Sequence, residues 1–552
     1  MSSSGTGILT GAGLAVAALE RVGVDVAFGL PGVHNLALWR ALGESPIRLV
    51  GVRHEQAAAY AADGYARASG RLGVALTTTG PGAANTLGAV GEAWASRQPL
   101  LVIATDIPTH LRRPGVWRGV LHEATDQAAM FAPVVKAAFT ATIAADLPDV
   151  AARAVGAPTA PPSRPAYLQV PTDLLGAEVG EPPRLDPPIP LPARPFGRAA
   201  ELLDASERPL IWAGSGALGV RDGGGPPGSG LAALAVRLGA PVVTTYGAAG
   251  LLRPSHPACV GMPPHVEPVG RLWDEADLVI SVGSDLDGVQ TQNFAMPQPP
   301  RLVAINLDAE DATKNYRADV VLDWFADEAC AELAGMVRSR GTDGLARRLQ
   351  GVRADACSAL DGRALRFLDA MRFAVPDDGI VVADMCIPGY WLAGFHTPSA
   401  PRKLQIPLGW GTLGYAFPAA LGAALADAGP VVAVAGDGGF LYAPGELATV
   451  AQEQLPLTVV IVDDGGYGML RYDQDVTGAD RYGVDLLTPD FVALAAAFGI
   501  RAEQVDGLDD AFGEALAAHV EDPAPSVLVA RTPEPLVPPP NTSPNWYRRA
   551  HR

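Results

Sequence analysis

Short aliphatic runs of strand length recur along the chain, and each is followed by a turn with Gly or Pro and an Ala-rich stretch of helical character. Buried strands that alternate with helices are typical of parallel sheets, so the pattern predicts an α/β protein. The runs and their turns read VALTTTGPGAANTLGAVGEAWA, PLLVIATDIP, PLIWAGSGALG, ADLVISVGSD, RLVAINLD, GPVVAVAGDGGF and LPLTVVIVDDGGYG.

Two segments interrupt this rhythm and divide the chain. Residues 176–198 are Pro-rich, which predicts a semi-rigid extended linker. Residues 338–364 are charged and Ala-rich, which predicts a helix and a connector. A length of 552 residues corresponds to about three domains. We therefore expect three doubly wound parallel-sheet domains at 1–178, 195–340 and 362–532, and a C-terminal tail at 533–552 that wraps the surface.

Composition and charge narrow the class of protein. The chain has 59 acidic and 41 basic residues, a formal net charge of −18, and 48% hydrophobic residues. The hydrophobic content suffices for sizeable cores, and the negative charge argues against nucleic acid or an anionic membrane as the main partner. The four cysteines form no Cys-x-x-Cys pair, which speaks against a zinc ribbon or a redox dithiol. The N-terminus lacks a basic leader and predicts an amphipathic helix, and no apolar run reaches about 20 residues, so we expect a cytoplasmic protein.

A candidate site follows the strand PVVAVA, where the chain reads GDGGF from Gly436 to Phe440. Asp437 stands at the carboxyl end of this strand, the edge where parallel sheets bind ligands. The next strand ends in DDGGYG, which brings Asp464 to the same edge. Unpaired carboxylates attract a hard cation, and glycines let phosphate approach the backbone, so the pair predicts a Mg²⁺–diphosphate site. A tight surface turn and an N-cap role for one aspartate are the plainer alternatives.

This arrangement resembles the diphosphate-binding motif of thiamine diphosphate (ThDP) enzymes. RHEQAAAYAADGYAR at 53–67 looks like the segment with the cofactor-activating glutamate, and GPGAAN at 80–85 and GWGTLG at 409–414 match further signatures. Their order is that of the acetolactate synthase-like branch, with a likeness to benzaldehyde lyase-type carboligases. The resemblance implies a pyrimidine-binding, a central Rossmann-like and a diphosphate-binding domain. It also implies active sites between the first domain of one subunit and the third of another, hence a homodimer or homotetramer.

Glu55 matches the acid that activates ThDP by contacting N1′ of the aminopyrimidine. The resemblance implies an apolar pocket around it, where burial favours sharing a proton. Leu413 matches the apolar residue that props the bent cofactor, and the carbonyl of Gly411 matches the acceptor of its 4′-amino group. An exposed surface glutamate and an ordinary core leucine are the alternatives.

The resemblance implies that Asp437, Asp464 and the carbonyl of Gly466 hold Mg²⁺. Most relatives carry Asn where Asp464 stands, so the extra charge should make this site depend more heavily on the metal. Ile387 and Pro388 stand where polar diphosphate contacts are expected, so binding should lean on backbone groups. The cofactor contacts implied besides Glu55, Gly411 and Leu413 are Pro31, Gly32, Asn85, Gly436, Gly438, Gly439, Tyr467, Gly468 and Met469. For Tyr467 and Met469, core packing is the alternative.

Two histidines are candidates for handling substrate protons. His34 matches a loop that overhangs the thiazolium in relatives, and His122 lies near the place of a substrate-contacting Gln. Histidine titrates near neutral pH and suits proton transfer to an alkoxide. A structural role is an equal alternative for each.

Residues 214–219, GSGALG, fit the G-x-G-x-x-G dinucleotide fingerprint after the strand PLIWA. Residues 221–227 interrupt the helix that should follow, so we interpret the motif as a degenerate nucleotide fold. Acetolactate synthases bind FAD in this domain partly through two arginines, and here Asp285 and Val289 stand in their places. A carboxylate facing a flavin diphosphate is unfavourable, which argues against FAD without removing it as an alternative.

The resemblance implies an acetolactate synthase-like carboligase or lyase that uses ThDP and Mg²⁺. It would decarboxylate a 2-oxo acid such as pyruvate and join the acyl unit to a second carbonyl. Simple decarboxylation and cleavage of an acyloin use the same machinery and stay open. A flavin- or NAD-dependent oxidoreductase is a more distant alternative that rests on residues 214–219.

Overall fold

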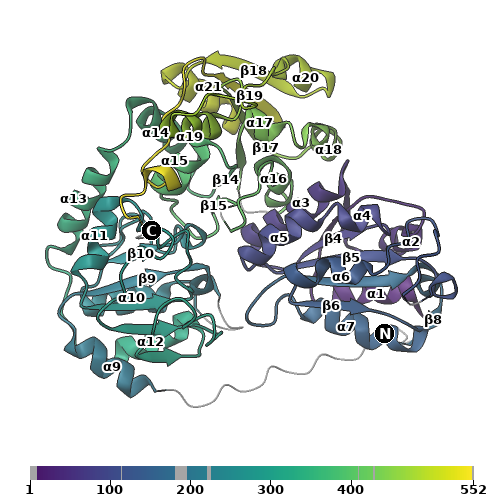
Figure 1. Cartoon of the computed structure of the whole chain (residues 1–552), viewed down its shortest axis with the longest axis horizontal. Helices are drawn as coiled ribbons and strands as arrows, with labels where there is room; N and C mark the ends of the chain where they lie inside the picture. The colour runs from purple at the N-terminus through teal and green to yellow at the C-terminus, as the bar shows by residue number, and fades with distance from the viewer. Residues whose placement is uncertain are drawn as a thin grey trace, which may run out of the picture.

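The computed structural model describes residues 9–113, 115–180, 195–219, 225–407, 409–426 and 429–549. Three parallel sheets form three α/β lobes along the chain, which Figure 1 shows in purple, teal and yellow-green. This confirms the predicted fold class, and the seven aliphatic runs that open the sequence analysis all contain strands. The predicted linker 176–198 lies for the most part outside the described residues.

The N-terminal sheet has six parallel strands in the order β3-β2-β4-β5-β7-β6. Its strands are β2 (Val26–Gly29), β3 (Arg48–Gly51), β4 (Gly73–Thr77), β5 (Leu100–Asp106), β6 (Ala137–Thr140) and β7 (Ala166–Pro171), and a separate antiparallel pair joins β1 (Leu9–Thr10) to β8 (Glu178–Val179). Its helices are α1 (Gly11–Arg21), α2 (Leu36–Leu42), α3 (Glu55–Ser69), α4 (Pro81–Ala84), α5 (Leu87–Ala95), α6 (Gln127–Phe131), α7 (Leu147–Gly156) and α8 (Thr172–Leu175). The helix predicted for the N-terminal segment is α1.

The central sheet has five parallel strands in the order β10-β9-β11-β12-β13. Its strands are β9 (Pro209–Ala213), β10 (Val242–Thr244), β11 (Leu278–Val282), β12 (Leu302–Ile305) and β13 (Val320–Leu322). Its helices are α9 (Phe196–Ala205), α10 (Ser229–Leu238), α11 (Glu267–Glu275) and α12 (Ala326–Met336), and α13 (Leu345–Cys357) is the helix predicted in the second connector.

The C-terminal sheet again has six parallel strands, in the order β15-β14-β16-β17-β19-β18. Its strands are β14 (Ile380–Ala383), β15 (Leu404–Gln405), β16 (Val431–Gly436), β17 (Leu457–Asp463), β18 (Arg501–Asp506) and β19 (Ser526–Arg531). Its helices are α14 (Gly362–Ala374), α15 (Ile387–Phe395), α16 (Ala416–Ala423), α17 (Asp437–Phe440), α18 (Leu447–Glu453), α19 (Gly468–Thr477), α20 (Phe491–Ala497) and α21 (Asp510–Glu521).

The two faces of the C-terminal sheet belong to two different hydrophobic cores. Ile380 and Val382 of β14 lie in a core shared with the N-terminal domain. Val381 and Ala383, which point to the opposite face, lie in a core shared with the central domain. Because both faces are buried, the strands β14, β16, β17 and β19 are mostly apolar without alternation, whereas β18 at the end of the sheet is polar and largely exposed.

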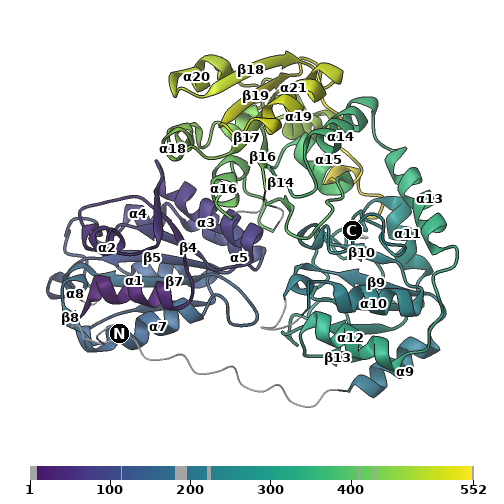
Figure 2. The ribbon, with the colours of Figure 1, turned by 180° about the vertical axis from the view of Figure 1, so that it is seen from behind.

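Helices α3 and α16 join the N-terminal and C-terminal domains, and they lie side by side in Figures 1 and 2. A Cβ atom on Gly64 would lie 2.0 Å from the Ala419 carbonyl oxygen, and one on Gly422 would lie 1.7 Å from the Ala61 carbonyl oxygen. The two glycines therefore permit backbone contact between the helices.

The C-terminal tail differs from the predicted surface wrap, since part of it is buried. The Trp391 indole donates a hydrogen bond to the Val537 carbonyl (3.0 Å), and the Asn541 amide donates to the Tyr390 carbonyl (3.2 Å). Asn541 is 5% exposed. Figure 2 shows the yellow tail between α15 and the central domain. Across the described ranges, the search for a helix long and apolar enough to cross a membrane finds none.

Candidate active site

Asp437 and Asp464 lie at one edge of the C-terminal sheet, as the sequence predicts. Strands β16 and β17 are parallel neighbours, with Gly436 opposite Val462, and Asp437 opens α17 directly after β16. Asp437 is 1% exposed, and among the described residues neither of its carboxylate oxygens has a hydrogen-bond partner. Burial and the neighbouring Asp464 raise the pKa of Asp437 to about 7. Burial also raises the pKa of Asp464 to about 6, although the Arg471 guanidinium opposes this rise.

The loop after β17 is held rigidly by its neighbours. Arg471 donates to the Asp464 carbonyl (2.7 Å) and pairs with the Asp485 carboxylate (2.7 Å). Within the described ranges, no three or more His, Cys, Asp and Glu side chains form a group suited to a metal. The donors at this edge are two carboxylates and the backbone of the loop around Gly466, an all-oxygen set of the kind Mg²⁺ prefers. Two neighbouring buried carboxylates repel each other unless enough positive charge lies beside them, so this pair suits a divalent cation.

Glycines bring the backbone of this edge close to its neighbours. A Cβ atom on Gly438 would lie 2.6 Å from the Tyr467 ring, one on Gly439 would lie 3.0 Å from the Asp384 carboxylate, and one on Gly468 would lie 2.2 Å from the Asp464 carboxylate. Side chains at these three glycines would occupy the space at this edge of the sheet. Met469 is half-buried and packs against the core shared with the central domain.

Helix α15 begins at the same edge without a side-chain cap. Ile387 and Pro388 occupy its first turn, and both are buried. The polar groups that this turn offers to a diphosphate are therefore backbone N–H groups, in line with the expectation from the sequence.

Glu55 is the first residue of α3 and is 8% exposed, so it is a buried acid as expected. The Asn85 amide donates to Glu55 Oε2 (3.0 Å), and a Cβ atom on Gly82 would lie 3.3 Å from Glu55 Oε1. The turn before α3 is fixed from the C-terminal domain, because the Glu446 carboxylate accepts hydrogen bonds from the N–H groups of Arg53 (2.9 Å) and His54 (3.0 Å).

His34 and His122 lie together, with ring centroids 5.1 Å apart. His34 Nδ1 hydrogen-bonds to the Thr79 hydroxyl (2.8 Å), which in turn contacts the Thr105 hydroxyl (2.8 Å). Burial and the neighbouring His122 lower the pKa of His34, so its neutral form, a proton acceptor, is favoured. The side chain of Gln127 accepts from the Gly80 N–H (2.6 Å) and fixes the turn beneath the pair.

The loop that carries His34 is also fixed. The Gly32 N–H donates to the Asn35 side chain (2.7 Å), which donates to the Leu30 carbonyl (3.1 Å). Asn35 is fully buried while Pro31 is exposed. Pro31 and Gly32 therefore lie on a rigid loop that reaches the surface.

The loop 409–414 carries two further predicted residues. Gly411 has φ +77°, a left-handed conformation that favours glycine, and Leu413 is half-buried. The Asp384 carboxylate accepts from the Gly414 N–H (3.1 Å), and burial raises its pKa to about 6. The Glu92 carboxylate, which is fully buried, accepts from three N–H groups of this loop.

Sequence reasoning missed Glu92 and Asp384 as parts of the site. Glu92 is the single charged residue in the helix LGAVGEAWA, directly after GPGAAN, and this isolated charge was the available signal. Asp384 directly follows the strand IVVA, much as Asp437 follows PVVAVA with one glycine between. Strand order places both strands side by side, which sequence alone did not reveal.

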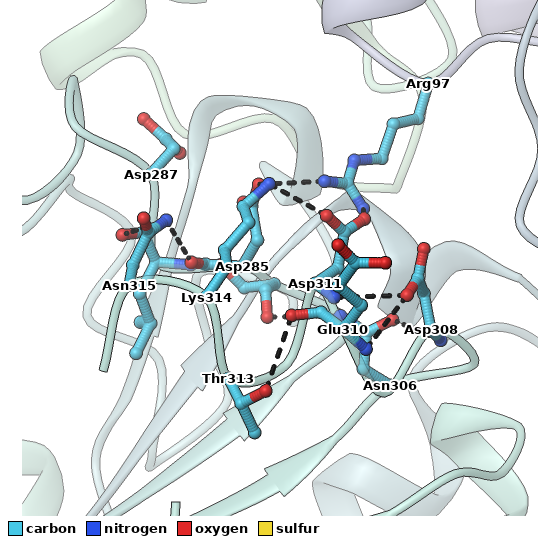
Figure 3. A network of polar contacts seen from close by, with 12 residues as sticks. Arg97, Asp285, Asp287, Asn306, Asp308, Glu310, Asp311, Thr313, Lys314 and Asn315 are labelled. Atoms are coloured by element: carbon cyan, nitrogen blue, oxygen red, sulfur yellow. Dashed lines mark hydrogen bonds and ion pairs between the residues drawn. The ribbon is translucent and has the colours of Figure 1, made fainter. Parts of the chain in front are cut away.

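The central domain carries a second group of carboxylates, shown in Figure 3. Asp285 follows β11 and pairs with Arg97 (2.8 Å) and Lys314 (2.7 Å). Asp311 follows β12 and pairs with Arg97 (2.5 Å), Lys314 (2.8 Å) and Arg164 (3.3 Å). Arg97 and Arg164 come from the N-terminal domain, so these ion pairs join two domains.

The motif at 214–219 forms a 3₁₀ turn (Ser215–Leu218), and α10 begins only at Ser229. The Gly216 N–H donates to the Gly283 carbonyl (2.9 Å), so this N–H group is occupied within the protein. The interrupted helix agrees with a degenerate nucleotide-binding fold.

Comparison with protein families matches three segments to the domains of thiamine pyrophosphate enzymes. Residues 9–130 match the N-terminal TPP binding domain, residues 196–333 match the central domain, and residues 386–530 match the C-terminal TPP binding domain. Glu55, His34 and His122 lie inside the first of these segments, and Asp437, Asp464 and the loop 409–414 lie inside the third.

Relatives match nearly the whole chain. A probable 2-ketoarginine decarboxylase of Pseudomonas aeruginosa is 36% identical over 91% of this chain and 90% of its own length. An acetolactate synthase of Mycobacterium bovis is 32% identical over 93% of this chain and 86% of its own. A probable acetolactate synthase large subunit of Methanocaldococcus jannaschii is 29% identical over 96% and 94%.

Proposed function

Since the chain belongs to the thiamine pyrophosphate enzymes of the acetolactate synthase-like kind, we propose that it is a ThDP- and Mg²⁺-dependent carboligase. It decarboxylates a 2-oxo acid such as pyruvate and joins the acyl unit to a second carbonyl. The observation that carries this proposal is the buried carboxylate of Asp437, which lacks a hydrogen-bond partner and lies beside Asp464. Reversal of the joining step alone, which is cleavage of an acyloin, would use the same residues.

Each residue of the site has a distinct task in this proposal. Bound ThDP would supply a thiazolium carbon that attacks the 2-oxo acid and accepts the electrons released with CO₂. Asp437, Asp464 and the Gly466 carbonyl would hold Mg²⁺ against the diphosphate, and the glycines 436, 438 and 439 would admit the phosphate oxygens. This placement is supported by the all-oxygen donors at the edge and by the clash of any Cβ atom at 438 or 439.

Glu55 would hold a proton at the pyrimidine N1′, and its burial and its hydrogen bond from Asn85 support this task. The Gly411 carbonyl would accept the 4′-amino group, and Leu413 would support the bent cofactor. His34 and His122 would exchange protons with the substrate oxygen, which the lowered pKa of His34 supports because a neutral imidazole accepts a proton.

We propose that the central domain has no task in flavin binding. Asp285 is a carboxylate where acetolactate synthases have an arginine, and it would repel a flavin diphosphate. Arg97 and Lys314, the nearby cations, are engaged by Asp285 and Asp311. This arrangement does not fit FAD, so no step is assigned to it.

A homodimer or homotetramer forms part of the proposal. Large apolar side chains are exposed on the single chain, among them Trp117 (66%), Trp410 (53%) and Leu487 (99%). Apolar surface of this kind is typical of a protein–protein interface. Light scattering coupled to gel filtration measures the oligomeric state.

The experiment that tests the proposal is a panel of 2-oxo acids with and without an added aldehyde, each with and without ThDP and Mg²⁺, read by mass spectrometry. We expect a 2-hydroxy ketone only when both cofactors are present. The variant Glu55→Gln should lower turnover at least about 100-fold because it removes the acid at N1′. Glu201→Gln, an exposed change on α9, is the control. Unchanged turnover in Glu55→Gln would contradict the assignment.

A second candidate function is decarboxylation of a 2-oxo acid with a cationic side chain, without a second carbonyl. Asp473 lies on α19, one turn after Met469, and its buried Oδ1 has no hydrogen-bond partner among the described residues. Burial raises the pKa of this carboxyl, so a cation beside it would be favourable. The relative named as a probable 2-ketoarginine decarboxylase supports this candidate.

The two candidate functions are separated by measuring the turnover of 2-ketoarginine and of pyruvate, with CO₂ release as the assay. For the second candidate, Asp473→Asn should lower kcat/KM about tenfold or more for 2-ketoarginine and leave pyruvate unchanged. Equal effects on both substrates would contradict a role of Asp473 in charge recognition.

A further inference from the structure

Glu92 lies on α5 of the N-terminal domain, but its hydrogen bonds reach the C-terminal domain. Its carboxylate accepts from the N–H groups of Gly409 (3.3 Å), Trp410 (2.9 Å) and Gly411 (3.2 Å). It also accepts from the Ser96 hydroxyl (2.7 Å) and pairs with Arg67 (3.2 Å). The side chain is fully buried.

A carboxylate is the side chain that can make these contacts at once. It has two oxygens and no donor, so it accepts from several N–H groups, whereas the amide of Gln would turn an NH₂ group toward some of them. Burying this charge would be unfavourable without compensation, which Arg67 and the three N–H groups supply. Arg67 is itself held by Asp63 (2.8 Å) and by the Ile406 carbonyl (3.1 Å).

The anchored loop is the one that the proposed function places under the cofactor. Gly411 carries the carbonyl assigned to the 4′-amino group, and Leu413 follows two residues later. The Gly411 N–H also donates to the Pro407 carbonyl (2.9 Å), and the Gly414 N–H at the end of the loop donates to the Asp384 carboxylate (3.1 Å). Glu92 binds the same Gly411 N–H group and those of the two residues before it, so it fixes the backbone that leads into the Gly411 carbonyl.

We propose that Glu92 is a positioning residue that fixes the loop 409–413 for the bent cofactor. This inference rests on the proposed function, because it needs ThDP to lie on this loop. Glu92 acts through the loop backbone: it sets where the Gly411 carbonyl and the Leu413 side chain meet the aminopyrimidine. The 4′-amino group must lie close to C2 to take its proton, so a displaced loop would slow that transfer.

The test compares Glu92→Gln with the wild-type holoenzyme. Two readouts are used: the Kd of ThDP at saturating Mg²⁺ by calorimetry, and the exchange rate of the C2 proton of bound ThDP in D₂O by quenched-flow NMR. We expect Glu92→Gln to weaken ThDP binding and to slow C2 exchange at saturating ThDP, each about 10- to 100-fold. Glu92→Asp, which keeps the charge but is shorter, should lie between, and it is the second variant if Glu92→Gln does not fold.

Asp277→Asn is the matched control. Asp277 also accepts from two backbone N–H groups, those of Glu207 (2.7 Å) and Arg208 (3.0 Å), but it lies in the central domain. We expect this change to lower the melting temperature and to leave ThDP affinity and C2 exchange unchanged.

A purely structural role for Glu92 would give the pattern of the control, and that result would overturn the inference. The wild-type protein could bind ThDP and exchange the C2 proton but convert none of the 2-oxo acids. This result would contradict the proposed function, and the Glu92 measurement would still decide the inference. A wild-type protein that fails to bind ThDP would overturn both.

Discussion

The carboxylate edges of the C-terminal and central domains have the same architecture and opposite electrostatics. In both domains, aspartates follow neighbouring parallel strands: Asp437 and Asp464 after β16 and β17, Asp285 and Asp311 after β11 and β12. Asp311 meets three cations, two of them from the N-terminal domain, and Figure 3 shows two of the three, Arg97 and Lys314. Asp437 meets none within hydrogen-bond distance among the described residues.

The pKa values of Asp311 and Asp437 reflect this difference in neighbouring charge. Burial alone would raise the pKa of Asp311, but Lys314 and Arg97 hold it below its ordinary value. At Asp437, burial and the like charge of Asp464 act in the same direction and raise the pKa to about 7. An aspartate beyond the carboxyl end of a parallel strand is therefore part of a domain interface in one case and of a candidate cation site in the other. Its partners make the difference.

The strongest test of this difference is to remove one carboxylate charge from each of the two edges. Asp437→Asn should lower turnover about 1,000-fold because Mg²⁺ loses a ligand, whereas Asp285→Asn should change turnover less than about threefold. Steady-state kinetics with saturating ThDP and Mg²⁺ measures both. Equal losses at the two edges would show that pairing does not distinguish them.

The pH dependence of the metal-free protein should reveal the unpaired carboxylate of Asp437. Asp437 has a pKa of about 7 when folded and an ordinary value of 3.8, so the folded state binds this proton more tightly. Its contribution to stability is complete below pH 3.8 and is lost as the pH rises through 7. Between pH 5 and 8 the free energy of unfolding should fall by about 2–3 kcal/mol from this group. Urea unfolding in EDTA measures the fall, and Asp437→Asn should remove it.

Breaking the paired edge should affect stability and spare the cofactor. Asp311→Asn leaves Arg97, Arg164 and Lys314 with one carboxylate fewer, and these partners are partly exposed. The free energy of unfolding should therefore fall by about 2 kcal/mol, less than for a fully buried pair. Chemical unfolding and ThDP titration measure the two effects. A weakened ThDP affinity without loss of stability would contradict a structural role.

The smallest expected effect comes from Asp464→Asn, which places at this position the residue that the family resemblance implies. Less repulsion at Asp437 should stabilise the metal-free protein by about 1 kcal/mol, and loss of a charge should weaken Mg²⁺ binding about tenfold. Calorimetric Mg²⁺ titration in the presence of ThDP checks this. Tighter Mg²⁺ binding in the variant would show that the second charge does not serve the metal.

Local sequence patterns predicted the features that depend on residues close together in the chain. The runs before Asp437 and Asp464 are continuous and apolar, so their strands and their common edge followed from sequence. The burial of Glu55 was implied by the family resemblance and not by a local pattern. Glu92 was missed because its partners, residues 409–411, lie in another domain. The ion pairs of Arg97 were missed for the same reason, since Arg97 and Asp285 are 188 positions apart. No period or motif records such contacts.

The buried faces of the C-terminal sheet have a consequence for how the chain comes apart. Ile380 and Val381 are adjacent in sequence, yet each is buried in a core shared with a different lobe. Helices of the C-terminal lobe itself cover both faces of that sheet, and the N-terminal lobe reaches the first core through the packing of α3 on α16. The C-terminal lobe thus shares a hydrophobic core with each of the other two lobes. We therefore expect the protein to melt in a single cooperative step rather than lobe by lobe.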